Sequence, residues 1–173
     1  MRWIPPRQGV FKLNTDGSLR HGTGLATAGG LIRDDSGHWI RGFSTNISIM
    51  TSFMAELWTL FYDLRLCIQL QLERIVVELD SASIVQLLEH EQGMELSSSP
   101  RILSVLLLEC LSMIATFPDC SIQHTLREGN GAAGSLANWG HSVDPGYHEL
   151  ITPPLGLSTI LIGDVMRVSF PRL

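Results

Sequence analysis

The sequence Val10-Phe11-Lys12-Leu13-Asn14-Thr15-Asp16-Gly17 decides the fold class, because apolar and polar side chains alternate along it. Successive side chains of a β-strand point to opposite faces. Phe11 and Leu13 therefore fall on one face, and the polar residues at positions 12, 14 and 16 fall on the other. The stretch predicts a half-buried strand that ends in the carboxylate of Asp16, and Gly17 would let a ligand or phosphate approach the backbone there.

Two further strands are predicted next, and the three strands form an antiparallel meander. The second strand is expected over 24–33, and Asp34-Asp35-Ser36-Gly37 is a strong hairpin turn that leads into a third strand over 38–47. Thr51 and Ser52 then begin a helix. The residues at helical spacing that give this helix a broad apolar face are Phe53, Leu57, Leu60, Phe61, Leu64 and Ile68.

The second half of the chain alternates between strands and helices. The predicted elements are a buried strand over 75–79, a helix through His90 capped by Ser81, a loop over 91–100, a helix over 101–116, a strand over 120–127 and a helix over 130–140. A helix between the third and fourth strands favours a parallel crossover. We therefore expect an α/β fold, in which a mixed sheet carries helices on its faces.

The length of 173 residues is that of one domain. We divide the chain into an N-terminal lead over 1–9, a domain over 10–141 and a C-terminal tail over 142–173 that docks on the domain. The start of the chain lacks the basic-then-apolar order of a secretory signal, and the longest apolar run is too short to span a bilayer. We expect a soluble intracellular monomer, nuclear or cytoplasmic, with no membrane contact.

The charge balance limits how the protein could bind nucleic acid. The net charge is −5, and Lys12 is the only lysine. This composition argues against a protein that holds nucleic acid mainly by releasing counterions, because that mode needs clustered basic residues. Phosphate contacts would have to come from arginines, amides and metal. The three cysteines, Cys67, Cys110 and Cys120, lie in apolar runs at wide spacings, and we expect buried reduced thiols there.

Three acids stand where elements end or begin. Asp16 ends the first strand, Asp80 ends the buried fourth strand, and Glu56 lies in the first turn of the long helix. If the first and fourth strands are neighbours, these carboxylates meet at one end of the sheet. Like charges in contact need cations between them, and oxygen ligands favour Mg²⁺ or Mn²⁺. A single acid at a strand end is more often a turn former, so these residues alone indicate only a candidate metal site.

The motifs around these acids resemble the ribonuclease H family. They are Lys12-Leu13-Asn14-Thr15-Asp16-Gly17-Ser18, Met54-Ala55-Glu56-Leu57 and Glu78-Leu79-Asp80-Ser81, in that order. The closer resemblance is to the plant ribonuclease H-like domain related to retroelement reverse transcriptases. It rests on Ala28-Gly29-Gly30-Leu31-Ile32-Arg33-Asp34 and His124-Thr125-Leu126-Arg127-Glu128-Gly129-Asn130, and covers about residues 3–140.

The resemblance implies a five-stranded mixed sheet and a two-metal site that cleaves the RNA strand of RNA–DNA hybrids with Mg²⁺ or Mn²⁺. Asp16, Glu56 and Asp80 match the first three catalytic, metal-binding carboxylates of the family. The fourth is an aspartate whose place is taken here by Gly134. Loss of a direct ligand should cost at least the roughly 10–100-fold that damage to outer-shell partners costs.

Substrate contacts are also expected by resemblance and position. The candidates are Gly17, Ser18, Thr51, Ser52, Ser81, Arg127 and Asn130. The hydroxyls of Thr51 and Ser52 could meet 2′-hydroxyls of an RNA strand or could only cap the helix. Arg127 could contact a phosphate or pair in the neighbourhood of Glu128.

Three functions remain open from the sequence. The first is a metal-dependent endoribonuclease acting on RNA–DNA hybrids, impaired by Gly134. The second is a catalytically inactive nucleic-acid-binding module, and the third is a retroelement remnant that makes a protein contact through its tail. The three retained carboxylates favour the first, whereas Gly134 and the acidic balance favour the other two.

Overall fold

The computed structural model describes residues 2–20, 22–49, 51–90 and 101–169. The strands are β1 Phe11–Leu19, β2 Leu25–Arg33, β3 Trp39–Ile49, β4 Arg74–Leu79, β5 Asp119–His124 and β6 Tyr147–Leu150. The helices are α1 Ser52–Gln69, α2 Ala82–His90, α3 Arg101–Thr116, α4 Gly131–Gly140 and α5 Ser158–Ser169, with single 3₁₀ turns at Arg127–Gly129 and Leu155–Leu157. The predicted loop over 91–100 lies outside the described residues.

The strands form one mixed sheet in the order β5-β4-β1-β2-β3-β6. The meander β1–β2–β3 is antiparallel. Strand β4 lies between β1 and β5 and is parallel to both. The pairing of β1 with β4 places Thr15 opposite Leu79. The expected adjacency of the first and fourth strands is therefore confirmed, and their carboxyl ends lie at the same edge of the sheet.

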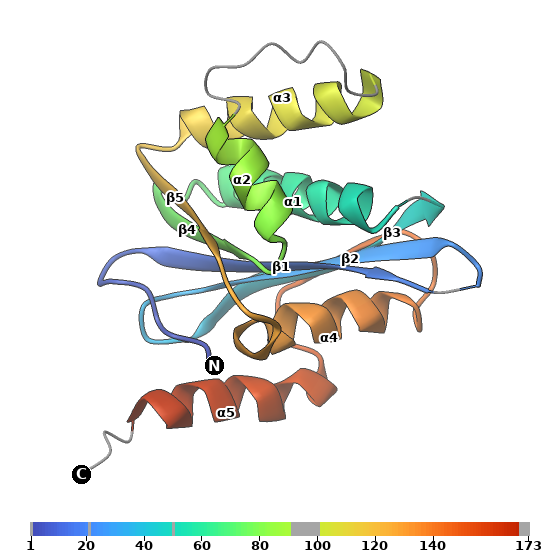
Figure 1. The fold of residues 1–173 in the computed structure, drawn as a ribbon. Coiled ribbons are helices and arrows are strands. Elements are labelled where there is room, and N and C mark those ends of the chain that lie inside the picture. Colours follow the sequence, from blue (N-terminus) through green and yellow to red (C-terminus); the bar gives the residue numbers. More distant parts are fainter. Residues whose placement is uncertain (1, 21, 50, 91–100, 170–173) are drawn as a thin grey trace.

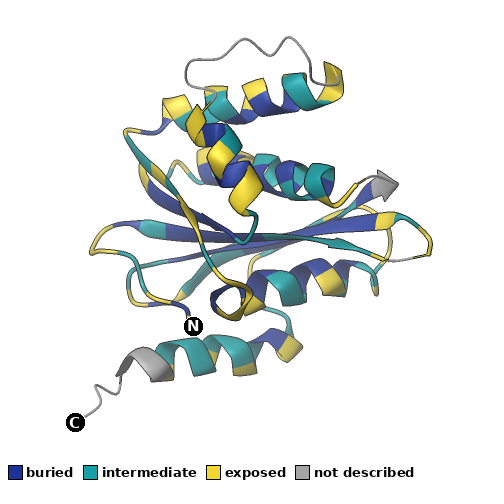
Figure 2. Ribbon diagram, in the orientation of Figure 1, coloured by how far each residue is buried: buried dark blue, intermediate teal, exposed yellow. Residues whose placement is uncertain are grey.

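The helices cover the two faces of the sheet (Figure 1). Helices α1, α2 and α3 lie on one face, and α4 and α5 lie on the other. The buried residues concentrate along the sheet and the inner sides of α1 and α4 (Figure 2). Helix α4 packs closely on the sheet at Gly29, since a Cβ at this position would come within 2.2 Å of the Ala137 nitrogen. Only glycine fits under α4 at this position.

The structure has one strand that was not predicted, and a predicted strand that is shorter than expected. The sheet has a sixth strand, β6, which pairs antiparallel with β3 inside the stretch that we expected to be only a tail. It is four residues long and has no run of β-branched residues, so alternation gave little signal. The fifth strand ends at His124, and Arg127 begins a 3₁₀ turn instead of ending the strand.

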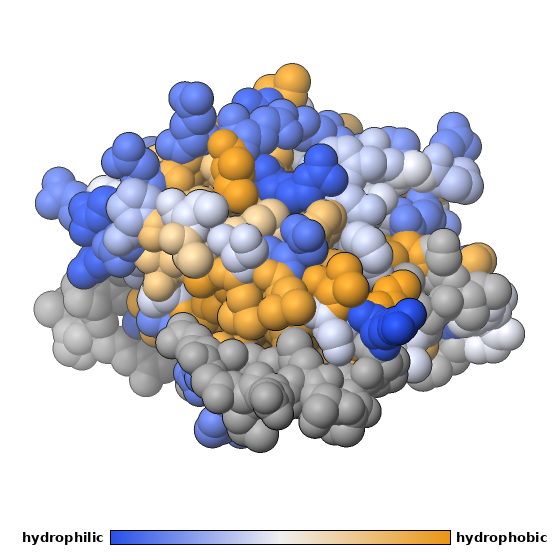
Figure 3. Space-filling view, turned by 90° about the horizontal axis from the view of Figure 1, so that it is seen from above, coloured by the Kyte–Doolittle hydropathy of each residue, from blue (hydrophilic) through white to orange (hydrophobic). Residues whose placement is uncertain are grey.

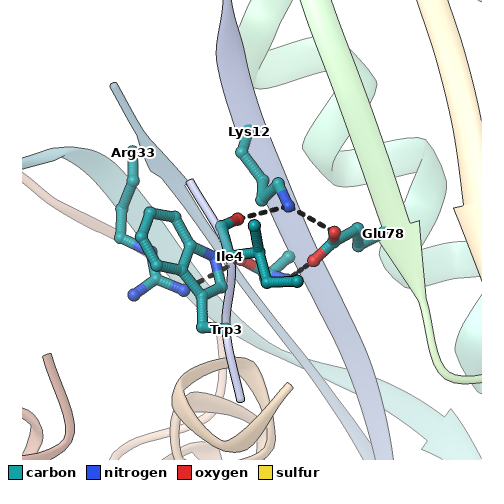
Figure 4. Close-up of polar contacts among 6 residues, drawn as sticks. Trp3, Ile4, Lys12, Arg33 and Glu78 are labelled. Atoms are coloured by element: carbon teal, nitrogen blue, oxygen red, sulfur yellow. Dashed lines mark hydrogen bonds and ion pairs between the residues drawn. The ribbon is translucent and has the colours of Figure 1, made fainter. Parts of the chain in front are cut away.

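A buried polar network lies on the face of β1 that carries residues 12 and 14 (Figure 4). Lys12 forms an ion pair with Glu78 of β4, and its Nζ also donates to the Ile4 carbonyl at 2.6 Å. Asn14 donates from Nδ2 to the second carboxylate oxygen of Glu78 at 3.0 Å. Lys12, Asn14 and Glu78 are at most 9% exposed, so this network replaces the water that these groups have lost.

The same network fixes both ends of the chain to the sheet. Arg33 of β2 donates to Asn14 Oδ1 at 3.0 Å and to Asp164 of α5 at 2.8 Å. The guanidinium carbon lies 3.8 Å from the centre of the Trp3 ring, and the Trp3 indole donates to Asn14 Oδ1 at 2.9 Å. The docking of the tail thus depends on a buried ion pair between Arg33 and Asp164.

The cysteines are free thiols as expected from the sequence, but only two of the three have the expected burial. All three are free; Cys67 and Cys110 are buried, and Cys120 is half-buried. Burial raises the pKa of the Cys110 thiol to about 12 and that of Cys120 to about 11. These thiols are therefore unreactive at neutral pH.

The outer side of α3 is an apolar surface. Ile102, Val105 and Leu108 are each more than half exposed, and apolar side chains gather on the face that is seen from above (Figure 3). Within the described part of the chain, no helix has the length and apolar character needed to cross a membrane.

Candidate metal centre

The carboxylates meet where the pairing of β1 with β4 stops and α1 begins; β1 itself runs on to Leu19 against β2, so Asp16 lies within the strand and does not end it as expected. Asp16 follows the last residue of β1 that pairs with β4, and Asp80 directly follows β4. The hydroxyl of Thr51 caps α1 by accepting from the Met54 amide at 3.3 Å, which places Glu56 in the second turn of the helix. A Cβ at position 17 would lie 3.0 Å from the Glu56 nitrogen, so Gly17 lets α1 approach β1.

The three carboxylates predicted from the sequence converge. One oxygen from each of Asp16, Glu56 and Asp80 lies within 4.8 Å of the others. They open into a cleft of about 480 Å³. The other residues that line this cleft are Gly17, Ser18, Leu19, Ser52, Arg127, Asn130, Gly131, Gly134, Ser135 and Asn138.

Crowding of these acids changes their protonation. Burial, and next the negative charge of Asp80, raise the pKa of Asp16 to about 7. Burial, and next the charges of Asp16 and Asp80, raise the pKa of Glu56 to about 9. The positive charge of Arg127, whose Nε lies 3.4 Å from Asp80 Oδ2, acts in the opposite direction on Asp16. At neutral pH, Glu56 therefore keeps its proton when no cation is bound.

The donor set fits a hard divalent cation. Glu56 Oε2 is buried and has no hydrogen-bond partner among the described residues, although a buried carboxylate oxygen normally has one. Carboxylate oxygens are the ligands that Mg²⁺ and Mn²⁺ prefer, at about 2.1 Å for Mg²⁺. Asp16, Glu56 and Asp80 would hold such an ion.

Helix α4 brings position 134 against the cluster without supplying a ligand. A Cβ built on Gly134 would lie 2.7 Å from Asp16 Oδ2. The position thus faces the carboxylates, as expected for the place of a fourth acid. In the described part of the chain, Asp16, Glu56 and Asp80 are the one group of His, Cys, Asp or Glu side chains that could hold a metal ion.

The structure separates the predicted substrate-contact residues into two groups. Gly17, Ser18, Ser52, Arg127 and Asn130 line the cleft. Thr51 and Ser81 are not among the lining residues; the hydroxyl of Thr51 caps α1, and that of Ser81 lies 3.2 Å from the Ser83 hydroxyl. The roles of all seven as substrate contacts stay predictions.

Arg127 and Asn130 have defined partners at the site. Arg127 pairs with Asp80, a partner that was not considered from the sequence, and its contact with a phosphate stays a prediction. Asn130 donates from Nδ2 to the Thr15 carbonyl at 2.7 Å and so ties the start of α4 to the end of β1.

One face of α4 was missed by sequence reasoning. Gly131, Ser135 and Asn138 line the cleft together with Gly134. Their spacing of three or four residues is that of one helix face, so the predicted helix over 130–140 held the signal once Gly134 was placed at the site.

Comparisons with known proteins agree with this geometry. A family described as reverse transcriptase-like matches residues 14–140. A protein of Arabidopsis thaliana, provisionally named a ribonuclease H protein, is 36% identical over 170 residues, which are 98% of this chain. The chain spans 27% of the length of that relative.

Solved structures share the fold. The N-terminal ribonuclease H domain of a Mycobacterium tuberculosis protein superposes with a TM-score of 0.68 at 20% identity, covering 77% of this chain and 94% of that one. Ribonuclease H1 of Halobacterium salinarum gives a TM-score of 0.68 at 22% identity, covering 77% and 98%. The LC11 ribonuclease H1, solved in complex with an RNA/DNA hybrid, gives 0.63 at 25% identity, covering 75% and 94%.

Proposed function

Because this chain belongs to the reverse transcriptase-like family, we propose that its ribonuclease H-like domain holds Mg²⁺ or Mn²⁺ in the cleft and hydrolyses the RNA strand of RNA–DNA hybrids slowly. The observation that carries the proposal is the convergence of Asp16, Glu56 and Asp80 within 4.8 Å at the end of the sheet. A carboxylate cluster that raises its own pKa values is costly unless a cation is bound there.

Each residue of the cleft has a role in this proposal. Asp16, Glu56 and Asp80 would hold the metal, which when bound lowers the pKa of water and stabilises charge on the leaving oxygen. Arg127, 92% exposed at its side chain, can turn from Asp80 towards a backbone phosphate. Asn130 holds the end of β1 in place through the Thr15 carbonyl.

Gly134 explains why hydrolysis should be slow. The site has three carboxylates where relatives of the ribonuclease H type carry four, so the metal that depends on position 134 is held weakly. Restoring the acid is sterically possible, because the Cβ of Gly134→Asp meets only the end of the Asp16 side chain, which can rotate.

The test is cleavage of a labelled RNA–DNA hybrid with Mg²⁺ or Mn²⁺ by the natural chain, Asp16→Asn and Gly134→Asp. We expect weak cleavage by the natural chain, none by Asp16→Asn, and at least roughly tenfold faster cleavage by Gly134→Asp. Absence of cleavage by all three folded proteins would contradict the catalytic proposal.

The alternative is a module that binds nucleic acid without cleaving it. Glycine at position 134 favours this alternative, because it removes a ligand while the cleft and its polar lining remain. The same cleavage assay separates the catalytic proposal from this alternative. No cleavage by the natural chain, together with cleavage by Gly134→Asp, would mean an intact scaffold that lacks one metal ligand.

A further inference from the structure

A chain of polar side chains extends the cleft away from the carboxylates along α4. The Ser18 hydroxyl of β1 lies 2.8 Å from Asn138 Oδ1. Nε2 of His141, which follows α4, lies 3.2 Å from the hydroxyls of both Ser18 and Thr27. Thr27 is fully buried, and Asn138 is exposed at the mouth of the cleft.

One assignment of the protons satisfies every contact in this row of side chains. Thr27 donates its hydroxyl proton to the Ala137 carbonyl at 2.6 Å, so it can only accept from His141. His141 Nε2 therefore carries a proton, and Ser18 accepts from it as well. Ser18 then donates its hydroxyl proton to Asn138 Oδ1. In this assignment every proton has an acceptor.

The result is an amide whose donor side is turned outward. Because Oδ1 of Asn138 faces Ser18, Nδ2 faces away from it. The hydrogen bonds found among the described residues include none from this Nδ2. An exposed donor held in one orientation beside an acidic cleft is suited to an oxygen acceptor.

We propose that Asn138 Nδ2 donates a hydrogen bond to the nucleic-acid backbone, to a ribose 2′-hydroxyl or a phosphate oxygen next to the one at the carboxylates. Ser18 and His141 are positioning residues that orient this amide. The proposal rests on the proposed function, since it names a contact of the same cleft.

The charge distribution supports a contact from a neutral amide. The one lysine, Lys12, is buried in the ion pair with Glu78 and cannot reach a ligand. Arg127 stands on the side of the cleft next to Asp80, and Asn138 lines the same cleft from the second turn of α4. A backbone bound in the cleft would then have a donor from each of these two residues.

The experiment is hybrid binding by fluorescence anisotropy in Mg²⁺, with the substrate shown to be intact by gel. We expect Asn138→Ala to bind roughly tenfold more weakly, as for one lost hydrogen bond to a charged or polar partner, and Asn138→Asp to bind more weakly still. Gln123→Glu is the matched control, because it makes the same amide-to-acid change in a separate groove and should bind like the natural chain.

Two further arms test the source of the acceptor and the role of Ser18. A loss confined to the hybrid, and absent with duplex DNA of the same sequence, assigns the acceptor as a 2′-hydroxyl; an equal loss with both assigns a phosphate. Ser18→Ala should weaken binding about as much as Asn138→Ala, whereas Ser18→Thr, which keeps the hydroxyl, should restore it.

The outcomes separate this proposal from the proposed function. If the natural chain binds the hybrid and both Asn138 variants, with unchanged melting temperature, bind equally well, this inference is overturned and the proposed function stands. If the folded natural chain does not bind the hybrid, both are overturned.

Discussion

Lys12, Asn14 and Asp16 lie on the same face of β1 at successive alternate positions, yet their surroundings differ. Lys12 and Asn14 are buried in a network in which the Lys12 and Glu78 charges pair and the amide of Asn14 is bonded. Asp16, one alternation further on, faces the carboxylates of Glu56 and Asp80, and burial and like charge raise its pKa to about 7.

The difference between these two regions separates buried charges that stabilise the fold from buried charges that could bind a ligand. Burying a charge is tolerated when an opposite charge and hydrogen bonds replace water, and this holds for Lys12 and Glu78. Among the described residues, the ion pair at the carboxylate cluster is that of Arg127 with Asp80, and the Arg127 side chain is largely exposed. The lack of a neutralising partner supports our proposal that this cluster binds a cation from outside.

The largest expected effect on stability comes from removing the ion pair between Lys12 and Glu78. Lys12→Met removes the ion-pair partner of the buried Glu78 carboxylate, and should lower the free energy of unfolding by about 3–5 kcal/mol. Urea unfolding measures this. Arg7→Met is the matched control, because the Arg7 pair with Asp119 is exposed and its loss should cost under about 1 kcal/mol. Similar losses of unfolding free energy in both variants would contradict the expected difference between the buried and the exposed ion pair.

A second prediction concerns metal binding at the carboxylate cluster. Gly134→Asp should tighten Mn²⁺ binding by roughly 10–100-fold, because it adds a carboxylate against Asp16. Gly131→Asp adds the same charge to the cleft at a position where a Cβ has open space, and should tighten binding much less. Calorimetric titration compares them. Equal gains would show that charge in the cleft matters and ligand position does not.

A third prediction concerns Asp63, a buried carboxyl outside the cleft. It is fully buried in α1 against Gly30, and both its oxygens lack hydrogen-bond partners among the described residues. Burial raises its pKa well above the usual value, so the folded state keeps a proton that the unfolded chain releases above about pH 4.

Stability should therefore fall as pH rises from about 4 towards the pKa of Asp63 in the fold. Asp63→Asn, which does not titrate, should flatten this dependence by roughly 1.4 kcal/mol per pH unit. Urea unfolding at several pH values gives the slope. An unchanged slope would mean that Asp63 finds a partner that the described residues do not include.

The sequence could predict the acidic end of the sheet because the information is local. Asp16, Glu56 and Asp80 each stand next to a strand end or helix start that alternation and helical spacing reveal. The ribonuclease H resemblance, confirmed by the family match, then identified Gly134 as a departure. The geometry of these acids followed once β1 and β4 were neighbours.

The parts that sequence reasoning missed depend on distant residues. The pair of Arg33 with Asp164 spans 131 positions, and nothing near either residue indicates the other. Strand β6 forms because β3 has a free edge, which is a property of the sheet and not of Tyr147–Leu150. The orientation of Asn138 likewise depends on Ser18, which is 120 positions away.

Calorimetric titration of the natural chain with Mn²⁺ shows whether the carboxylate cluster binds a divalent cation. Because Asp16 and Glu56 have pKa values raised to about 7 and about 9, the cation must displace protons. We predict binding that tightens as pH rises from about 6 to about 9, releases protons to the buffer and disappears in Asp16→Asn. No binding by the folded chain, or affinity independent of pH and of Asp16, would contradict the account.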